Sequence, residues 1–312
     1  MTVSPITGLV AATHTPFHQD GSLNPAGVER QCSHLLANGV KTAFIDGTTG
    51  ESSALTLAER QELASTWMEV SRGTPLKVIV HAGSNCLEDS RVLAAQAQEL
   101  GAYAVSAVAP SYFKPASPAA LIASMAQIAG AAPDLPFYYY EIPTMTGITV
   151  SPSDFLRLAG EAIPNLAGLK FTSSNFMEYQ LCTNVHEGAF DVPFGFDEML
   201  LGALAFGAKG AVGSTYNFAA PIYLRLIAAF ERGDFVAARE EQFRSVRLIQ
   251  VLVRHGFMAA AKTTMKLLGV DVGPPRLPNL SLTEAQAEQL HRDLAELGFF
   301  DWIASDSPTL LA

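Results

Sequence analysis

One pattern repeats from the start of the chain to about residue 217: a short run of β-branched or aromatic residues, then a stretch with helical spacing. The strand-like runs are at residues 8–13, 42–46, 77–81, 104–109, 136–140, 167–172, 192–196 and 211–214. Helix-like stretches include 24–38, 56–72, 87–100 and 118–131. Parallel strands need crossover connections of this kind, so the alternation predicts a parallel sheet of the α/β class. Eight such units fit a (β/α)8 barrel, or TIM barrel, for which about 250 residues is typical.

Local signals support the helix boundaries. Thr56 followed by Glu59 predicts a capping box, and Ser151 followed by Asp154 predicts its acidic version. Glycine at residues 39 and 101 predicts helix ends, because glycine adopts the left-handed conformation that closes many helices.

A doubly wound open sheet is the competing architecture. It would normally carry a G-x-G-x-x-G loop after its first strand, whereas this strand leads into Thr15-Pro16-Phe17. The barrel is therefore favoured. Strand signals stop after Asn217, and residues from about 221 onward have helical character, interrupted by Gly273-Pro274-Pro275. We predict a catalytic barrel at 1–225 and a C-terminal helical appendage at 226–312, packed on the barrel.

Composition narrows the class of partner. The 312 residues are 49% hydrophobic, and 20 Lys plus Arg stand against 30 Asp plus Glu, a formal net charge of -10. Such a chain lacks the basic surface typical of nucleic-acid or anionic-membrane binding. Three scattered cysteines indicate free thiols in a reducing compartment. Residues 1–17 do not resemble a signal peptide, and the apolar stretch at 119–132 is too short to span a bilayer. We expect a cytoplasmic protein with a small-molecule substrate.

Lys170 is the most informative single residue. Active sites of barrels form where the strands end, and Lys170 lies near the end of the run 167–172. Strand side chains alternate, so Gly168, Lys170 and Thr172 share one face while the apolar pair Leu169 and Phe171 shares the other. The polar face is predicted to point into the barrel, where a poorly hydrated amine is available to attack a carbonyl, with Gly168 leaving room for substrate. The alternative is a lysine that extends to solvent or pairs with a carboxylate.

Two other strand ends carry candidate groups. The turn Gly47-Thr48-Thr49-Gly50 offers two hydroxyls and several N–H groups that can hold a carboxylate, although capping threonines in an ordinary turn look the same. By strand parity Tyr138 and Tyr140 point inward, and Tyr140 can carry a proton unless it is only a packing residue. The histidines show no metal-ligand spacing, so we expect neither a metal nor a cofactor.

Taken together, these motifs resemble the pyruvate-dependent aldolase family that contains N-acetylneuraminate lyase and dihydrodipicolinate synthase. The resemblance covers nearly the whole chain. It rests on Gly8-Leu9-Val10-Ala11-Ala12-Thr13 with Thr15-Pro16-Phe17, Gly47-Thr48-Thr49-Gly50-Glu51, Tyr140-Glu141-Ile142-Pro143 with Gly147, Gly168-Leu169-Lys170, Gly213-Ser214-Thr215-Tyr216-Asn217, and Gly273-Pro274-Pro275-Arg276-Leu277-Pro278. One motif alone would be weak, but the full set in this order is specific.

The resemblance implies a role for each matching residue. Lys170 is expected to form a Schiff base with pyruvate, and Thr48 and Thr49 to hold the pyruvate carboxylate, Thr48 also serving in a proton relay. Tyr140 is expected to pass the proton to or from the sugar hydroxyl. Tyr112 matches the family tyrosine that reaches into a neighbouring subunit's site, which implies a homotetramer.

Within the family, the sequence is more similar to the sialic acid lyase branch. The residues expected to bind substrate beside the two threonines are Thr172, Gly195, Asp197, Glu198 and Ser214. Synthases of the family carry an arginine where this chain has Met145, which cannot bind a second carboxylate. Glu141 departs from the lyase pattern, in which asparagine or histidine is more usual, and its charge leaves the choice of sugar open.

The resemblance therefore implies a class I lyase that cleaves N-acetylneuraminate to N-acetylmannosamine and pyruvate. One alternative is an aldolase or dehydratase for another 2-keto-3-deoxy sugar acid that uses the same Lys170. The other is a non-catalytic barrel that binds pyruvate or a sugar.

Overall fold

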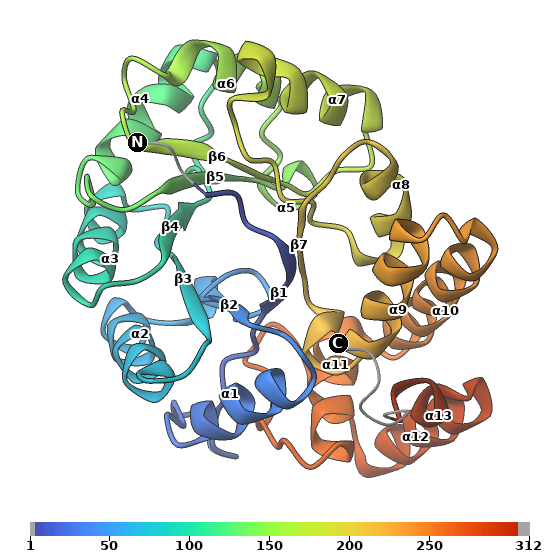
Figure 1. The fold of residues 1–312 in the computed structure, drawn as a ribbon. Coiled ribbons are helices and arrows are strands. Elements are labelled where there is room, and N and C mark those ends of the chain that lie inside the picture. Colours follow the sequence, from blue (N-terminus) through green and yellow to red (C-terminus); the bar gives the residue numbers. More distant parts are fainter. Residues whose placement is uncertain (1–3, 305–312) are drawn as a thin grey trace.

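The computed structural model describes residues 4–304, and its centre is a curled parallel sheet of seven strands (Figure 1). The spatial order of the strands is β6-β5-β4-β3-β2-β1-β7, and every pairing is parallel. The strands are β1 (Gly8–Ala12), β2 (Thr42–Ile45), β3 (Lys77–His81), β4 (Ala104–Ala107), β5 (Phe137–Glu141), β6 (Leu166–Phe171) and β7 (Gly210–Gly213). The predicted parallel sheet is confirmed, and most of its strands are at the predicted positions.

The predicted strand at 192–196 is not a regular strand. Between β6 and β7 the chain makes isolated parallel bridges, in which Phe194 pairs with Phe171 on one side and with Ala211 on the other. Its backbone hydrogen bonds alternate between the two neighbouring strands, and Pro193 contributes only a carbonyl, accepting from the Phe171 N–H. Because proline has no N–H to donate, the ladder is interrupted at this position.

Helices connect the strands and surround the sheet (Figure 1). Those of the strand-and-helix region are α1 (Gly27–Ala37), α2 (Leu57–Ser71), α3 (Leu87–Glu99), α4 (Pro118–Ala129), α5 (Pro143–Thr146), α6 (Pro152–Ala159), α7 (Phe176–Asn184) and α8 (Leu200–Ala205). Short 3-10 turns are η1 (Ser52–Ala54), η2 (Val185–Gly188), η3 (Asp197–Met199) and η4 (Thr215–Asn217). The four helices predicted by range are confirmed, each beginning or ending within a few residues of its prediction.

The predicted helix signals are present in the structure. Thr56 and Glu59 form the full capping box of α2, and the Ser151 side chain accepts the Asp154 N–H at the start of α6. Gly39 and Gly101 have φ of 75° and 76°, the left-handed conformation expected after α1 and α3.

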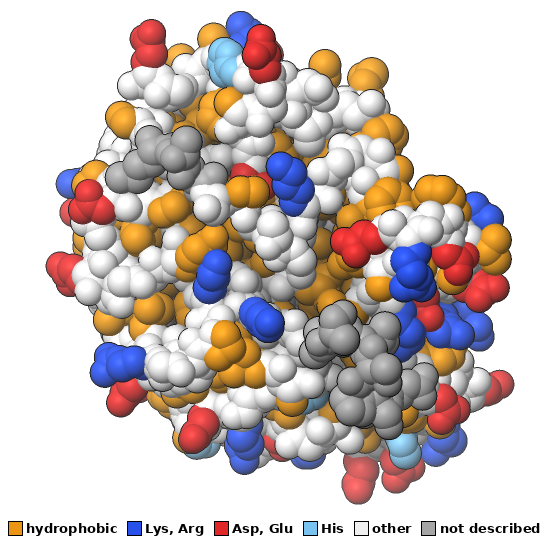
Figure 2. Space-filling model, viewed as in Figure 1, with side chains coloured by type: hydrophobic (Ala, Val, Ile, Leu, Met, Phe, Trp, Pro, Cys, Tyr) orange, Lys and Arg blue, Asp and Glu red, His pale blue; other side chains and the backbone are white. Residues whose placement is uncertain are grey.

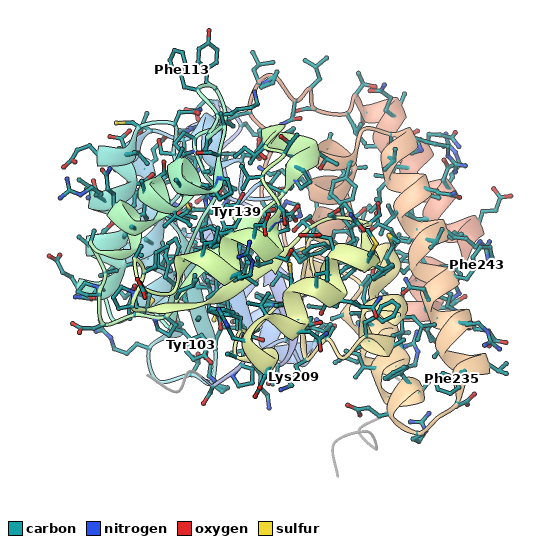
Figure 3. All side chains as sticks on the ribbon, turned by 90° about the horizontal axis from the view of Figure 1, so that it is seen from above. Tyr103, Phe113, Tyr139, Lys209, Phe235 and Phe243 are labelled. Atoms are coloured by element: carbon teal, nitrogen blue, oxygen red, sulfur yellow. The ribbon has the colours of Figure 1, made fainter. Side chains whose placement is uncertain are left out.

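Two apolar clusters lie on opposite sides of the sheet. Tyr139, Leu169 and Phe171 belong to the large cluster between the sheet and its helices. Tyr138 and Tyr140 belong to a smaller cluster, formed by the alternate strand residues that point to the inside of the curled sheet. The strand parity predicted from the sequence is therefore confirmed, and Lys170 lies on the inner side. Figure 3 shows the two ends of the curled sheet. Phe113, which follows β4, lies at one end, and Tyr103 and Lys209, which precede β4 and β7, lie at the other.

Within the described residues, the 3-10 turn η4 and then helices follow β7. The helices are α9 (Ala220–Glu231), α10 (Phe235–Arg254), α11 (Phe257–Leu267), α12 (Glu284–Leu297) and α13 (Phe299–Ile303). They lie together beside α1 and α8, in orange and red (Figure 1). The last eight residues of the predicted appendage are outside the described range.

Acidic and apolar groups are distributed unevenly on the face shown in Figure 2, where several basic side chains also lie inside the rim. In Figure 2 acidic side chains lie mostly around the rim of the face shown, while apolar atoms are visible toward its middle. Among residues 4–304, no helix combines the length and apolarity needed to cross a bilayer. Within the same range Cys32, Cys86 and Cys182 are free, as expected.

Candidate active site

A cavity of about 240 Å³ opens where the strands end, and it collects most of the predicted site residues. Of those predictions, the cavity wall contains Thr48, Thr49, Tyr140, Lys170, Thr172, Gly195, Asp197, Glu198 and Ser214. These residues come from the ends of β2, β5, β6 and β7 and from the segment before α8. Parallel strands bring their carboxyl ends to one edge, which is why positions so far apart in sequence meet here.

Lys170 is buried without a carboxylate partner. Its side chain is 5% exposed, and no ion pair involves it among the described residues. Its Nζ lies 3.8 Å from the ring centroid of Tyr140 and 4.8 Å from that of Phe44. Tyr140 is directly opposite Lys170 on the neighbouring strand, so sheet register fixes the pair. The alternative of a lysine that extends to solvent or pairs with a carboxylate is wrong.

Hydroxyl groups line the same cavity as the amine. The Tyr140 hydroxyl is 3.2 Å from Thr48 Oγ1, and Thr49 Oγ1 is 2.6 Å from Ser214 Oγ. Within residues 4–304, the backbone N–H groups of Thr48 and Thr49 have no hydrogen-bond partner. Two free N–H groups and two hydroxyls therefore line one side of the cavity, which suits a carboxylate.

Asp197 lines the cavity and also holds the neighbouring chain by hydrogen bonds. Its Oδ2 accepts hydrogen bonds from the Thr215 N–H at 2.8 Å and from the Thr215 hydroxyl at 2.5 Å. Burial raises its pKa to about 6, against the lowering effect of those bonds. Gly213 lets the carboxylate approach, because a Cβ there would collide with Asp197. Glu198, next along the chain, is partly exposed in the wall and has no such anchor among the described residues.

The expectation that Gly168 leaves room for substrate is wrong. A Cβ at Gly168 would collide with the backbone of Asp191, and the Leu169 N–H donates to the Asp191 carbonyl. The glycine thus makes room for the segment that bridges β6 and β7. Gly195 has a similar role, because a Cβ there would collide with Thr172 Oγ1.

Glu141 lies outside the cavity. It is 7% exposed, and its Oε2 accepts the Thr172 N–H at 3.0 Å. Burial raises its pKa to about 7, and the nearby Glu178 contributes in the same direction. Its charge therefore does not line the substrate space, although its hydrogen bond holds the backbone of a residue that does.

Tyr112 is the one predicted site residue that the fold does not bring to the cavity. Its side chain is 80% exposed, and its ring packs edge-on against Phe113, which is 86% exposed. The Tyr112 N–H donates to Asn85 Oδ1, which fixes the loop that carries it. Figure 3 shows Phe113 at the outer tip of this loop.

The C-terminal helices contribute cavity residues that the sequence did not suggest. Ile249 and Val253 of α10 and Phe257 of α11 complete the wall, with Phe196 and Ile142. Apolar residues on helices predict packing in general, so no sequence signal pointed to a role here.

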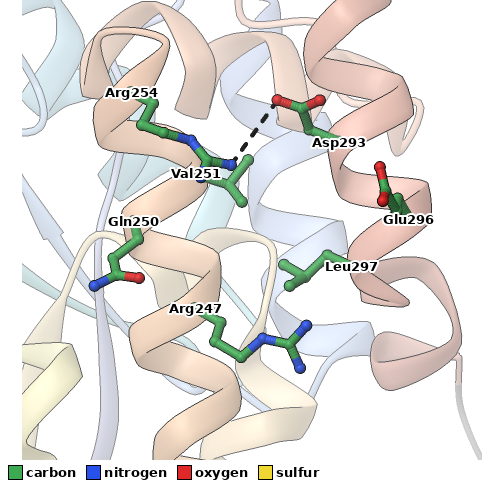
Figure 4. Close-up of a pocket in the computed structure, with 7 residues that line it drawn as sticks. All are labelled: Arg247, Gln250, Val251, Arg254, Asp293, Glu296 and Leu297. Carbon is green, nitrogen blue, oxygen red and sulfur yellow. Dashed lines mark ion pairs between the residues drawn. The ribbon is translucent and has the colours of Figure 1, made fainter.

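A second hollow, of about 340 Å³, lies between α10 and α12 (Figure 4). Its wall is formed by Arg247, Gln250, Val251, Arg254, Asp293, Glu296 and Leu297. Arg254 pairs with Asp293 at 4.0 Å, but Arg254 is 67% exposed. The wall has no nucleophile comparable to Lys170, so the smaller cavity is the candidate active site. Among the described residues, no three His, Cys, Asp or Glu side chains form a metal-binding group.

Comparisons with known proteins agree with this geometry. The family model described as the dihydrodipicolinate synthetase family matches residues 5–297. N-acetylneuraminate lyase of Mus musculus is 38% identical over 306 residues, covering 97% of this chain and 95% of the mouse protein. N-acetylneuraminate lyase A of Xenopus laevis is 42% identical over 276 residues, with 88% and 90% covered.

Solved structures give the same result. N-acetylneuraminate lyase of Proteus mirabilis has a TM-score of 0.92 at 40% identity, covering 95% of this chain and all (100%) of that chain. Dihydrodipicolinate synthase of Cyanidioschyzon merolae has a TM-score of 0.86 at 31% identity, with 94% and 98% covered. From the family match, the relatives and the fold, the chain belongs to the dihydrodipicolinate synthetase family.

Proposed function

We propose that this protein is a Schiff-base carbon–carbon lyase that cleaves N-acetylneuraminate to N-acetylmannosamine and pyruvate through Lys170. The observation that carries the proposal is the buried amine of Lys170, without an ion pair among the described residues, over the Tyr140 ring in a cavity of about 240 Å³. The vertebrate relatives named N-acetylneuraminate lyase are 37% to 42% identical to this chain, which supports the choice of sugar.

Pyruvate recognition is assigned to the turn after β2. Thr48 and Thr49 provide the free N–H groups and hydroxyls that suit the carboxylate of a 2-keto acid. With the carboxylate held there, the adjoining C2 carbonyl faces Lys170. The amine attacks C2, and loss of water gives an iminium ion that remains bonded to Nζ.

Carbon–carbon cleavage then needs one proton transfer. The iminium accepts the electron pair of the C3–C4 bond, and Tyr140 removes the proton of the C4 hydroxyl, which becomes the aldehyde of N-acetylmannosamine. Thr48, 3.2 Å from the Tyr140 hydroxyl, is in place to relay that proton. Protonation of the resulting enamine at C3 and hydrolysis of the imine release pyruvate and free Lys170.

The sugar chain is assigned to the part of the cavity beyond the pyruvate site. Thr172, Gly195, Asp197, Glu198 and Ser214 line the cavity and offer polar groups to a polyol. Ser214 adjoins the pyruvate site, because its Oγ is 2.6 Å from Thr49 Oγ1. Met145 is 65% exposed and does not line the cavity, so this chain lacks the second carboxylate anchor expected of a synthase.

The broader organisation is also proposed. We assign the segment around Phe194 as the eighth position of a closed (β/α)8 barrel, since it hydrogen bonds to both β6 and β7. The division into 1–225 and 226–312 would cut α9, so that helix would belong to both parts. Tyr112, exposed at its loop, supports the proposal of a homotetramer in which it enters a neighbour's site. A cytoplasmic location remains a proposal from composition.

A direct assay tests the function. Purified protein is incubated with N-acetylneuraminate, and pyruvate and N-acetylmannosamine are measured in equal amounts. Cleavage of another 2-keto-3-deoxy sugar acid but not of N-acetylneuraminate would move the chain to another substrate. Binding of pyruvate with no turnover of any such acid would favour the non-catalytic barrel.

A further inference from the structure

His81 packs against the Tyr140 ring but does not line the cavity. It is the last residue of β3 and is 1% exposed. Its Nδ1 is 2.7 Å from the carbonyl oxygen of Asp46, and a carbonyl can only accept, so Nδ1 carries the proton. Its Nε2 is then the acceptor for the Val108 N–H at 3.2 Å. One imidazole thus joins the chain after β2 to the chain after β4.

The surroundings keep this imidazole neutral. Arg60, itself 4% exposed, donates to the His81 carbonyl at 2.6 Å and to the Gly83 carbonyl at 2.9 Å. Burial, followed by the charges of Arg60 and Lys170, holds the pKa of His81 well below its usual value. Both ring nitrogens are already engaged, so His81 has no free position for proton transfer to substrate.

The ring also supports Tyr140. The His81 and Tyr140 rings meet edge to face, with centroids 5.8 Å apart and an interplanar angle of 89°. Phe44 packs against both rings, at 6.0 Å and 5.7 Å. Lys170 lies over the same Tyr140 ring, so the position of that ring sets the spacing between amine and hydroxyl.

The space for His81 is made by a specific neighbour. A Cβ at Gly83 would come within 2.8 Å of His81 Nε2 and within 2.6 Å of the Val108 nitrogen. Only a residue without a side chain permits the imidazole to reach the β4 side. The hydrogen-bonded bridge from Asp46 to Val108 therefore depends on His81, which forms it, and on Gly83, which leaves space for it.

We infer that His81 is a positioning residue, which fixes the Tyr140 hydroxyl relative to Thr48 and Lys170 by holding both the Asp46 carbonyl and the Tyr140 ring. The inference rests on the proposed role of Tyr140 in proton transfer. The two effects converge, because Asp46 begins the turn that carries Thr48, and Thr48 is the hydrogen-bond partner of Tyr140. Loss of His81 should therefore impair proton transfer while leaving Lys170 able to form its imine.

The test compares His81→Leu with His81→Asn. Leucine removes both hydrogen bonds, whereas asparagine retains a donor that can reach the Asp46 carbonyl. His81→Leu should lower kcat for N-acetylneuraminate cleavage by about 10-fold to 100-fold, the scale of a small misplacement of catalytic groups, with KM changed less than about threefold. Borohydride trapping of pyruvate on Lys170 should stay within about threefold of the parent rate. The kcat of His81→Asn should be at least about fivefold higher than that of His81→Leu.

His34→Leu is the matched control. His34 is likewise bonded to a backbone carbonyl, that of Asn217 at 2.9 Å, but it lies on α1, outside the curled sheet. The kcat of His34→Leu should equal that of the parent. An unchanged kcat in His81→Leu would overturn the inference, as would an equal loss of trapping and cleavage. If the leucine variant does not fold, His81→Asn alone decides: kcat must fall by about twofold or more with trapping unchanged.

A parent that traps pyruvate but cleaves no N-acetylneuraminate would refute the proposed substrate, not the role of His81. The same variants would then be compared by exchange of pyruvate methyl protons with deuterated water. This exchange also moves a proton beside Thr48 and Tyr140, so the order parent, Asn, Leu is still expected. Equal exchange rates in all three would overturn the inference.

Discussion

Among the described residues two lysines are buried, and they differ in whether the amine has a carboxylate partner. Lys170 is 5% exposed and Lys262, on α11, is 2% exposed. Lys262 pairs with Glu51 at 2.7 Å and donates to the carbonyls of Thr15 and Pro274, both at 2.9 Å. Lys170 contacts aromatic rings and faces a cavity.

The difference shows that burial alone does not make a lysine reactive. Lys262 donates hydrogen bonds to two carbonyls and pairs with Glu51, so three partners hold its nitrogen in place, whereas Lys170 has no such partners among the described residues. Burial lowers the pKa of Lys262 to about 8, although Glu51 acts against that shift. Lys262 also lines a hollow of about 130 Å³, but its nitrogen is held by Glu51 and the two carbonyls. Lys170 is also buried, but it faces the active-site cavity, whose wall includes the hydroxyl residues Thr48 and Tyr140.

Replacing each lysine in turn gives the largest expected contrast. Lys170→Ala should abolish turnover, by about 10⁴-fold or more, since removing a covalent nucleophile removes the pathway itself. Borohydride reduction with pyruvate should add one pyruvate-derived mass to Lys170 in the parent and none in the variant, as read by peptide mass spectrometry. An adduct on Lys262 or Lys209 would contradict the assignment.

The second prediction concerns stability. Lys262→Met should lower the free energy of unfolding by about 3–5 kcal/mol, because Glu51 is left as a buried charge without a partner. Urea denaturation measures the change. The double variant Lys262→Met with Glu51→Gln should recover part of the loss, since the unpaired charge is then absent. A single variant within about 1 kcal/mol of the parent would show that the ion pair contributes little.

Two of the buried glutamates, Glu51 and Glu141, extend the comparison. Glu51 has a buried cation, whereas Glu141 has none, and burial raises the pKa of Glu141 to about 7. A carboxyl with a raised pKa binds its proton more tightly when folded, so stability falls as pH rises from about 4.5 to about 7. Glu141→Gln retains an acceptor for the Thr172 N–H and removes this penalty. Its stability relative to the parent should therefore rise by about 1–3 kcal/mol between pH 4.5 and pH 8 in urea titrations. A difference that is the same at both pH values would contradict the assignment.

The smallest predicted effect separates the two halves of the active site. Glu198→Ala should slow cleavage of N-acetylneuraminate about tenfold, near 1.4 kcal/mol, by removing a hydrogen bond to the sugar. Pyruvate trapping on Lys170 should be unchanged, because the three-carbon acid does not reach Glu198. Glu198 is preferred to Asp197 for this test, since Asp197 also holds Thr215. Equal loss of both activities would show that Glu198 supports the fold or the pyruvate side.

Much of the fold and the site was predictable from local sequence. The inward direction of Tyr138, Tyr140 and Lys170 follows from strand alternation, which is a property of the backbone and holds wherever a strand forms. Helix starts at Thr56 and Ser151 were predicted because capping involves residues only three apart. Once the strands are parallel, their carboxyl ends must share one edge, which placed Thr48 near Tyr140.

Other features required the tertiary structure. The segment at Phe194 failed as a regular strand because Pro193 has no N–H and the chain must bridge two neighbours at once. Gly168 was assigned to substrate space, but whether a glycine faces a ligand or a neighbouring backbone depends on the position of Asp191.

The sequence by itself determined the order of strands and helices, the side of each strand that faces inward, and the motifs on which family membership rests. These are set by local backbone geometry and by side-chain type. Only the tertiary structure decided which buried lysine has a carboxylate partner, that Glu141 accepts the Thr172 N–H, and that His81 packs against Tyr140. Each of these depends on contacts between residues far apart along the chain, whose distances no local pattern encodes.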